Sequence, residues 1–205
     1  MRKLVRLAIY HGVNNRSPET SLTIPNLITI GRFLLVPLVI YALLDRQAGL
    51  AFAGFLIAGV SDGVDGFIAR HFNQRSELGA YLDPIADKVL LVSVFIVLGL
   101  LGQLPLWLVI VAVSRDALII SGVLLANLMG SPMEMRPLLV SKANTAVQIA
   151  LAALVLAMQA FQFDVGAPLS FLIYLSGLLT IASAAAYLVA WLGHMTAHGQ
   201  GEPDN

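Results

Sequence analysis

Six long apolar stretches, separated by short polar turns, dominate this chain of 205 residues. They lie near residues 26–44, 48–69, 82–102, 105–129, 140–161 and 168–193. Apolar stretches of about 20 residues are typical of helices that cross a bilayer. Because 58% of the residues are hydrophobic and only 12% are charged, one soluble core could not bury so much apolar surface. The sequence therefore predicts an all-α membrane protein with six transmembrane helices.

The six stretches are interpreted as one domain, residues 25–194, because no repeat or low-complexity segment divides them. Residues 1–24 form a basic juxtamembrane segment, and residues 195–205 form a short polar tail. The first segment fits either an N-terminal interfacial helix or a disordered basic tail. It lacks the long apolar core and the cleavage site of a signal peptide. It is also short for a mitochondrial presequence, so we expect a bacterial inner membrane.

Basic residues gather on one side of the predicted spans. They precede the first span and lie between spans two and three and between spans four and five, whereas the opposite loops carry only Arg46. The positive-inside rule then places the N-terminus, these two loops and the C-terminus in the cytoplasm. A net charge of zero gives no reason to expect a nucleic acid partner. The absence of cysteine excludes disulfides and thiolate metal sites.

Carboxylates stand out where the second and third spans approach the cytoplasmic side. There are four of them: Asp62, Asp65, Asp83 and Asp87. On helices, each pair shares one face with small residues, so two facing helices would enclose a polar cavity open to the cytoplasm. All-oxygen ligands favour Mg²⁺, Mn²⁺ or Ca²⁺, and four carboxylates balance two such ions. The structural alternative is that these aspartates cap helix ends or pair with Arg70 and Lys88.

A two-metal site of this kind predicts displacement at phosphorus on an anionic ligand such as a diphosphate. A carboxylate-gated cation transporter and a structural membrane protein with an inactive site are the rival functions. A transporter has no need for the small residues and the arginine beside the aspartates. Their complete set also argues against an inactive site.

The spacing of these residues carries a resemblance to a known family. The pattern D-x-x-D-G-x-x-A-R-x(8)-G-x-x-x-D-x-x-x-D occupies residues 62–87, and it resembles the signature of the CDP-alcohol phosphotransferases. The resemblance implies that the four aspartates hold two Mg²⁺ or Mn²⁺ ions, with Asp87 also the general base. It further implies a nucleotide site formed by Asp62, Gly66, Ala69, Arg70 and Gly79.

Secondary motifs make the chain most similar to the eukaryotic-type cardiolipin synthases within that family. They are the segments 74–79 and 82–88, Ser114-Arg115-Asp116 and the segment 141–148. The phosphatidylglycerophosphate synthases, the next most similar group, typically have Arg-Glu in place of Arg115-Asp116. The resemblance implies that CDP-diacylglycerol and phosphatidylglycerol react to form cardiolipin and CMP. Glycerol 3-phosphate, which would give phosphatidylglycerophosphate, stays the alternative acceptor.

Three basic residues are assigned to acceptor binding: Arg115 near mid-membrane, Arg32 in the first span and Lys142 where the fifth begins. A charge inside a span marks a candidate functional residue. The alternatives are a buried Arg115–Asp116 ion pair and interface anchoring by the other two. The nearby stripe of Asn144 and Gln148 either lines the cavity or joins two helices by hydrogen bonds. A homodimer stays open as the assembly.

Overall fold

The computed structural model describes residues 24–71, 77–128 and 139–198. These residues form six α-helices and contain no β-strand. The helices are α2 (Ile24–Leu44), α3 (Ala48–His71), α4 (Glu77–Leu100), α5 (Leu106–Leu128), α6 (Leu139–Phe161) and α7 (Ala167–His198). Ten of the twelve predicted boundaries are within two residues of these, but α4 begins at Glu77 rather than at 82 and α7 continues to His198 rather than to 193. The all-helical prediction is confirmed for the described residues.

The predicted N-terminal interfacial helix lies almost entirely outside the described residues, as do residues 199–205 of the predicted tail. The division of the chain at residues 24 and 194 therefore stays a prediction.

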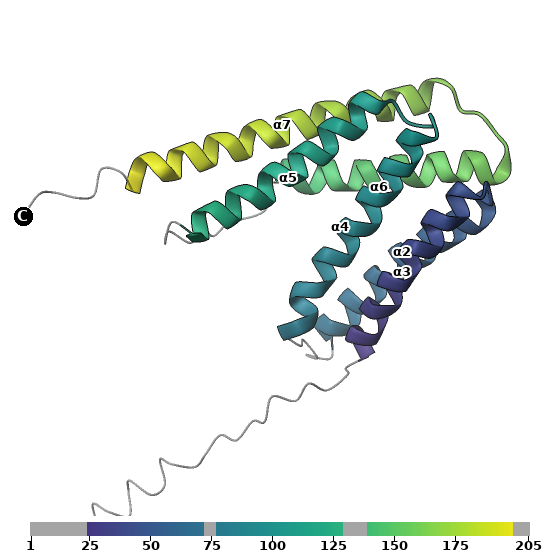
Figure 1. Cartoon of the computed structure of the whole chain (residues 1–205), viewed down its shortest axis with the longest axis horizontal. Coiled ribbons are helices and arrows are strands. Elements are labelled where there is room, and N and C mark those ends of the chain that lie inside the picture. Colours follow the sequence, from purple (N-terminus) through teal and green to yellow (C-terminus); the bar gives the residue numbers. More distant parts are fainter. Residues whose placement is uncertain (1–23, 72–76, 129–138, 199–205) are drawn as a thin grey trace, which may run out of the picture.

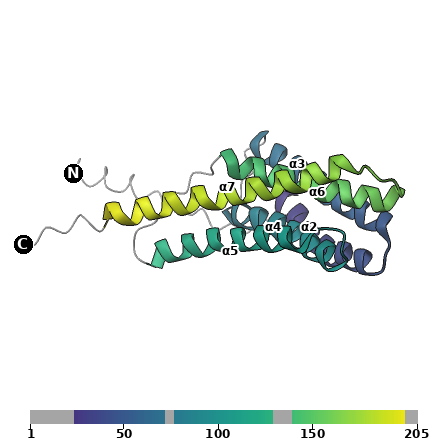
Figure 2. The ribbon, with the colours of Figure 1, turned by 90° about the horizontal axis from the view of Figure 1, so that it is seen from above.

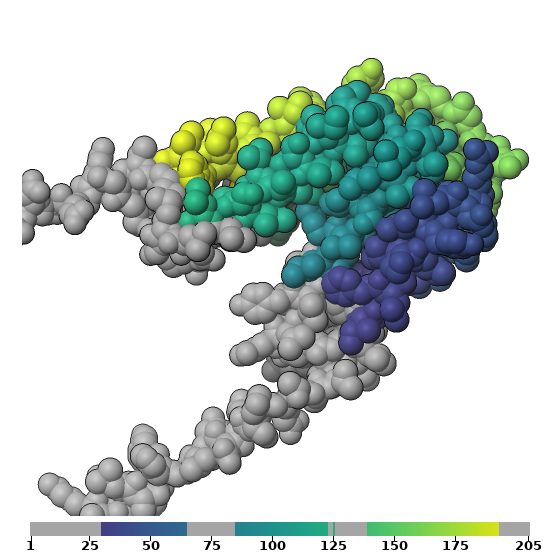
Figure 3. All heavy atoms as spheres, viewed as in Figure 1, coloured from purple at the N-terminus to yellow at the C-terminus, as the bar shows by residue number. Residues whose placement is uncertain are grey.

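Helix α4 lies at the centre of the arrangement (Figure 1). Helices α2 and α3 pack against each other on one side of it, and α5 and α7 pack against each other on the other side. Helix α6 joins the two halves, because it contacts both α3 and α7. The space-filling view shows the two halves on either side of teal α4 (Figure 3), and the view from above shows α5 beside α7 (Figure 2).

Short turns with a left-handed residue reverse the chain after α2 and after α4. After α2, Arg46 has a φ of 58°, and the Gln47 N–H donates to the Ala42 carbonyl over 2.8 Å. After α4, Gly102 has a φ of 72°, and the Gln103 N–H donates to the Leu98 carbonyl over 2.8 Å. These bonds satisfy carbonyls that a helix end would otherwise leave unpaired. The turns therefore make α2 antiparallel to α3 and α4 antiparallel to α5.

The described side chains form an apolar core that also contains polar groups, and they leave many large apolar groups exposed. Large hydrophobic residues are exposed on all six helices, and Leu34, Leu100 and Tyr174 are about 70% or more exposed. The buried residues include eight polar or charged ones: Arg32, Arg115, Asp116, Asn144, Gln148, Ser176, Thr180 and Ser183. Soluble proteins rarely expose so many large hydrophobic side chains. The distribution is the one expected of a chain surrounded by lipid.

Length and hydropathy single out two helices as able to cross a membrane within the described residues: α6 and the Ala167–Leu192 part of α7. The apolar windows of α2 and α3, Ile30–Leu44 and Ala48–Val64, are shorter. A buried core helix of a soluble protein passes the same test, so the six-span topology stays a prediction.

Candidate metal and substrate site

Three helices bring the side chains of Arg32, Asp62 and Asp87 together. The Arg32 Nη1 donates to Asp87 Oδ1 and lies 3.1 Å from Asp62 Oδ1. Arg32 is 1% exposed, whereas the carboxylate side chains of Asp62 and Asp87 are 45% and 43% exposed. The buried guanidinium of Arg32 therefore contacts two carboxylates that are themselves accessible to solutes.

The packing of α2 explains this geometry. Helices α3 and α4, which carry the aspartates, make few direct contacts, but both pack against α2. Arg32 lies on α2 and so reaches both of them. The sequence predicts two acidic faces that meet each other, and in the structure a third helix supplies a cation between them.

The remaining members of the predicted site lie on the same two helices. Asp65, Gly66, Ala69 and Arg70 belong to α3, and Gly79 and Asp83 belong to α4. Their side chains lie outside the described residues. Among the side chains that are described, no group of three or more His, Asp or Glu residues gathers. The structure thus unites Asp62 with Asp87, and the four-carboxylate site stays a prediction.

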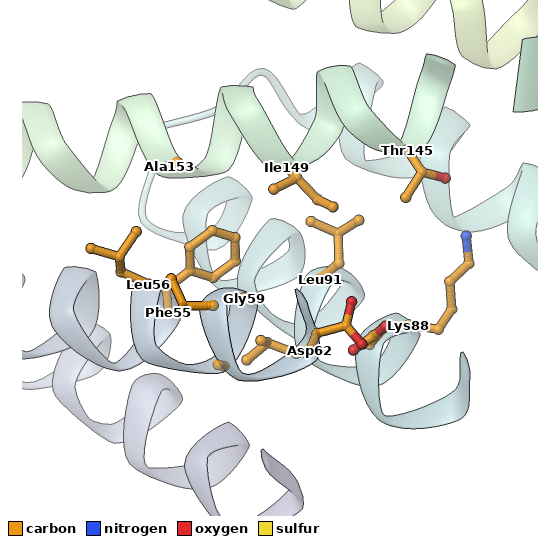
Figure 4. A pocket seen from close by; sticks show the side chains of 13 residues that line it. Phe55, Leu56, Gly59, Asp62, Lys88, Leu91, Thr145, Ile149 and Ala153 are labelled. Atoms are coloured by element: carbon orange, nitrogen blue, oxygen red, sulfur yellow. The ribbon is translucent and has the colours of Figure 1, made fainter. Parts of the chain in front are cut away.

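A pocket of about 540 Å³ opens beside these carboxylates, between α3, α4 and α6. Figure 4 shows Leu56 and Phe55 of α3 and Ile149 of α6 along its apolar part, with Asp62 and Lys88 toward one end. Asp87 also lines it. The pocket therefore combines a long apolar wall with charged groups, as a ligand with an apolar tail and an ionic head requires.

A second buried cluster lies on the other side of α4. Asp116 Oδ1 accepts hydrogen bonds from Lys88 Nζ over 2.7 Å and from Arg115 Nη1 over 2.8 Å. Because Asp87 and Lys88 are neighbours on α4, about 100° apart around the helix, one contacts α2 and α3 while the other contacts α5. The structure thus contains the Arg115–Asp116 ion pair that the sequence left as an alternative.

Further side chains of α6 and α7 enclose the Arg115 guanidinium. Its Nη2 donates to Ser141 and Ser183, and its carbon lies 5.6 Å from the centre of the Tyr187 ring. Sequence reasoning missed Ser183 and Tyr187. A readable signal existed, because Ser176, Thr180, Ser183 and Tyr187 recur at steps of four, three and four, which places them on one face of α7.

A profile of the CDP-alcohol phosphatidyltransferase family matches residues 22–196. This chain belongs to that family. The matched region contains all six described helices apart from the last residues of α7, and it contains both charged clusters.

Curated relatives in this family carry one recurring name. The chain is 35% identical over 198 residues to a cardiolipin synthase (CMP-forming) / mitochondrial hydrolase fusion protein of Schizosaccharomyces pombe. The aligned region covers 86% of this chain and 33% of that protein. It is 35% identical to the cardiolipin synthase (CMP-forming) of Rattus norvegicus over 83% of this chain, and 34% identical to that of Homo sapiens over 82%. The chain spans 62% of each of these two relatives.

The described carboxylates suit the divalent cation that the family resemblance implies. Oxygen atoms of Asp62 and Asp87 already share one cationic nitrogen, so their separation permits a shared positive charge. Carboxylate oxygens are the donors that Mg²⁺ and Mn²⁺ prefer. The two described carboxylates therefore have the chemistry that such an ion requires, and the metal site itself stays a prediction.

The polar stripe of α6, Asn144 and Gln148, is hydrogen-bonded to α7. Thr180 Oγ1 donates to Asn144 Oδ1 over 2.9 Å and accepts from Gln148 Nε2 over 3.3 Å. Asn144 and Gln148 are buried, and neither is among the residues that line the 540 Å³ pocket. The hydrogen-bonding alternative for this stripe matches the structure.

Lys142, in the first turn of α6, is exposed.

Proposed function

We propose that the chain is a phosphatidyltransferase that transfers a phosphatidyl group from CDP-diacylglycerol to phosphatidylglycerol, with cardiolipin and CMP as products. The observation that supports it most directly is the open Asp62–Asp87 pair beside an apolar pocket, on the motif that defines the family. The name of the curated relatives agrees with it.

The proposal places all six helices across a bilayer, with the aspartates toward the cytoplasm of a bacterial inner membrane. The apolar surface on every helix supports this placement. So does the 540 Å³ pocket, since a lipid with charged phosphates and acyl chains needs the two kinds of wall that it combines. Phe55, Leu56 and Ile149 would contact an acyl chain, and the phosphates would lie toward Asp62 and Asp87.

The reaction joins an acceptor oxygen to the phosphorus that bears diacylglycerol. The bond from that phosphorus to the CMP oxygen breaks, and CMP leaves with the electron pair. Asp87 takes the proton of the attacking hydroxyl as general base. Asp62, Asp65, Asp83 and Asp87 would hold two Mg²⁺ or Mn²⁺ ions, which neutralise charge on the diphosphate when bound.

The nucleotide and the acceptor would occupy different sides of α4. Gly66, Ala69, Arg70 and Gly79 would surround the cytidine nucleotide with Asp62. Arg115 and Lys142 would bind the acceptor phosphate, whereas Arg32 is buried against Asp62 and Asp87 and would act on these carboxylates. The described contacts add Lys88 to the acceptor-binding cations, because it lines the pocket and bonds Asp116. An exposed Lys142 in the first turn of α6 is accessible to an anionic head group.

An acceptor assay with the purified protein tests the proposal. CMP release from CDP-diacylglycerol is measured with phosphatidylglycerol or with glycerol 3-phosphate, each with Mg²⁺ and with Mn²⁺. We expect cardiolipin with the first acceptor and no CMP when EDTA replaces the metal. If product forms only with glycerol 3-phosphate, the acceptor is glycerol 3-phosphate and not phosphatidylglycerol. Metal transport into liposomes without CMP release would overturn the enzyme function itself.

A further inference from the structure

One arginine nitrogen stands between the two described carboxylates of the proposed metal site. Nη1 of Arg32 contacts an oxygen of Asp62 and an oxygen of Asp87. The arginine is buried, while both carboxylates are nearly half exposed. A cation bound to both carboxylates from the solvent side would therefore meet a positive charge that the protein itself supplies.

The charge of Arg32 affects both the stability of the carboxylate pair and its affinity for a metal ion. Two carboxylates held so close repel each other, and repulsion is strong where the surroundings are partly apolar. The Arg32 charge offsets that repulsion in the protein without metal. The same charge lowers the affinity of Asp62 and Asp87 for a second cation, because like charges repel and because one oxygen of each carboxylate is already bonded to Arg32.

We propose that Arg32 is an internal counter-ion of the aspartate site, which holds Asp62 and Asp87 together without metal and competes with a divalent ion for them. This inference rests on the metal site of the proposed function. Arg32 is a positioning residue in this role, since it acts on the carboxylates and not on the reacting atoms.

The first test measures Mn²⁺ affinity without any lipid substrate, by the loss of the free Mn²⁺ signal in electron paramagnetic resonance. Arg32→Gln removes the charge and keeps a polar side chain, and Arg32→Lys keeps the charge. We expect Arg32→Gln to bind Mn²⁺ about tenfold more tightly than wild type, or ~1.4 kcal/mol. Arg32→Lys should stay within about threefold of wild type, because the repelling positive charge is kept.

Arg115→Gln is the matched control for the loss of a buried arginine. Arg115 is also buried and also pairs with an aspartate, but its partner is Asp116. Its loss should leave Mn²⁺ affinity unchanged. Equal affinity for wild type and Arg32→Gln would overturn the competition, and weaker binding by Arg32→Gln would show that Arg32 instead arranges the carboxylates for the metal.

The second test needs no metal and compares unfolding midpoints in EDTA. Asp62→Asn in wild type breaks the contact with Arg32, so the midpoint should fall. The same change in Arg32→Gln removes one of two repelling carboxylates, so the midpoint should rise. Asp62→Asn should thus have opposite effects on the midpoint in the two backgrounds. The test still works if Arg32→Gln alone does not fold, because the double variant should then recover a folded protein.

The outcomes separate this inference from the proposed function. If wild type binds no Mn²⁺, the metal site and the competition both fail, even if the midpoints show the sign reversal. If wild type binds Mn²⁺ but Asp62→Asn lowers the midpoint in both backgrounds, the metal site stands and the counter-ion role is overturned. A double variant that also fails to fold would overturn it as well.

Discussion

The two buried arginines of this protein occupy opposite kinds of site. Arg32, between α2, α3 and α4, is bonded to two carboxylates that are nearly half exposed. Arg115, between α5, α6 and α7, is bonded to Asp116, whose side chain is 9% exposed, and is enclosed by two serines and a tyrosine. One cluster presents its negative groups to solutes, and the other keeps them inside.

That difference suggests a division of labour between the two halves. A metal ion has to leave water when it binds, so it needs negative groups that are accessible and incompletely neutralised. The Asp62–Asp87 pair fits this requirement. The Arg115 cluster is paired on several sides, as a buried charge must be in order to be stable. Lys88 connects the halves, because it bonds Asp116 and also lines the pocket.

The largest expected effect is the loss of activity in Asp87→Asn. The amide keeps the size of the side chain but cannot take a proton or supply a full negative charge to a metal. We expect CMP release to fall by about 10³-fold, which is within the usual range for a lost general base. Initial rates with CDP-diacylglycerol and phosphatidylglycerol, measured at saturating Mg²⁺, test this.

Asp45→Asn is the matched control, because the same chemical change falls in the turn between α2 and α3, at the other end of these helices. Asp45 accepts a hydrogen bond from the exposed Gln47 side chain. Its activity should stay within about twofold of wild type. If Asp87→Asn is as active as this control, Asp87 is not the general base.

Much of the fold and part of the site were predictable from the sequence. Apolar length gave the helices, since a bilayer-length apolar run has few other stable forms. The regular spacing of Asp62 and Asp87 within the motif pointed to a shared site, and the structure brings these two together. The family prediction is confirmed by the profile match to residues 22–196.

Contacts between distant helices could not be predicted in the same way. The sequence marks Arg32 as an intramembrane charge, but its partners lie 30 and 55 positions away along the chain, and only the packing of α2 selects them. Likewise, Lys88 and Asp116 each have several potential partners. Which helices become neighbours depends on the shape of many apolar side chains, and a local pattern does not record that shape.

Arg115→Gln is expected to produce the second largest effect, this time on stability. Removing one member of a buried pair leaves the Asp116 charge less compensated, although Lys88 still reaches it. We expect a loss of about 2–3 kcal/mol, a little below the usual range for a broken buried pair. Thermal unfolding in detergent should show the same decrease with EDTA and with Mn²⁺. A decrease that Mn²⁺ abolishes would instead connect Arg115 to the metal site.

A smaller effect is expected for the link between the halves. Lys88→Met and Asp116→Asn, alone and together, form a double-mutant cycle on the 2.7 Å contact. Because the Lys88 side chain is 31% exposed, we expect a coupling energy of only about 1 kcal/mol. Unfolding midpoints provide the measurement. Strictly additive losses would mean that Lys88 and Asp116 do not stabilise each other.

The smallest effect is expected where the buried hydrogen bonds carry no charge. Thr180→Val keeps the shape of the side chain but removes the hydroxyl that bonds Asn144 and Gln148. Such bonds between membrane helices contribute about 0.6 kcal/mol each on average, so the loss should be about 1 kcal/mol. Activity at a temperature well below unfolding should be unchanged. If activity fell while the unfolding midpoint held, the stripe on α6 would serve a ligand rather than helix packing.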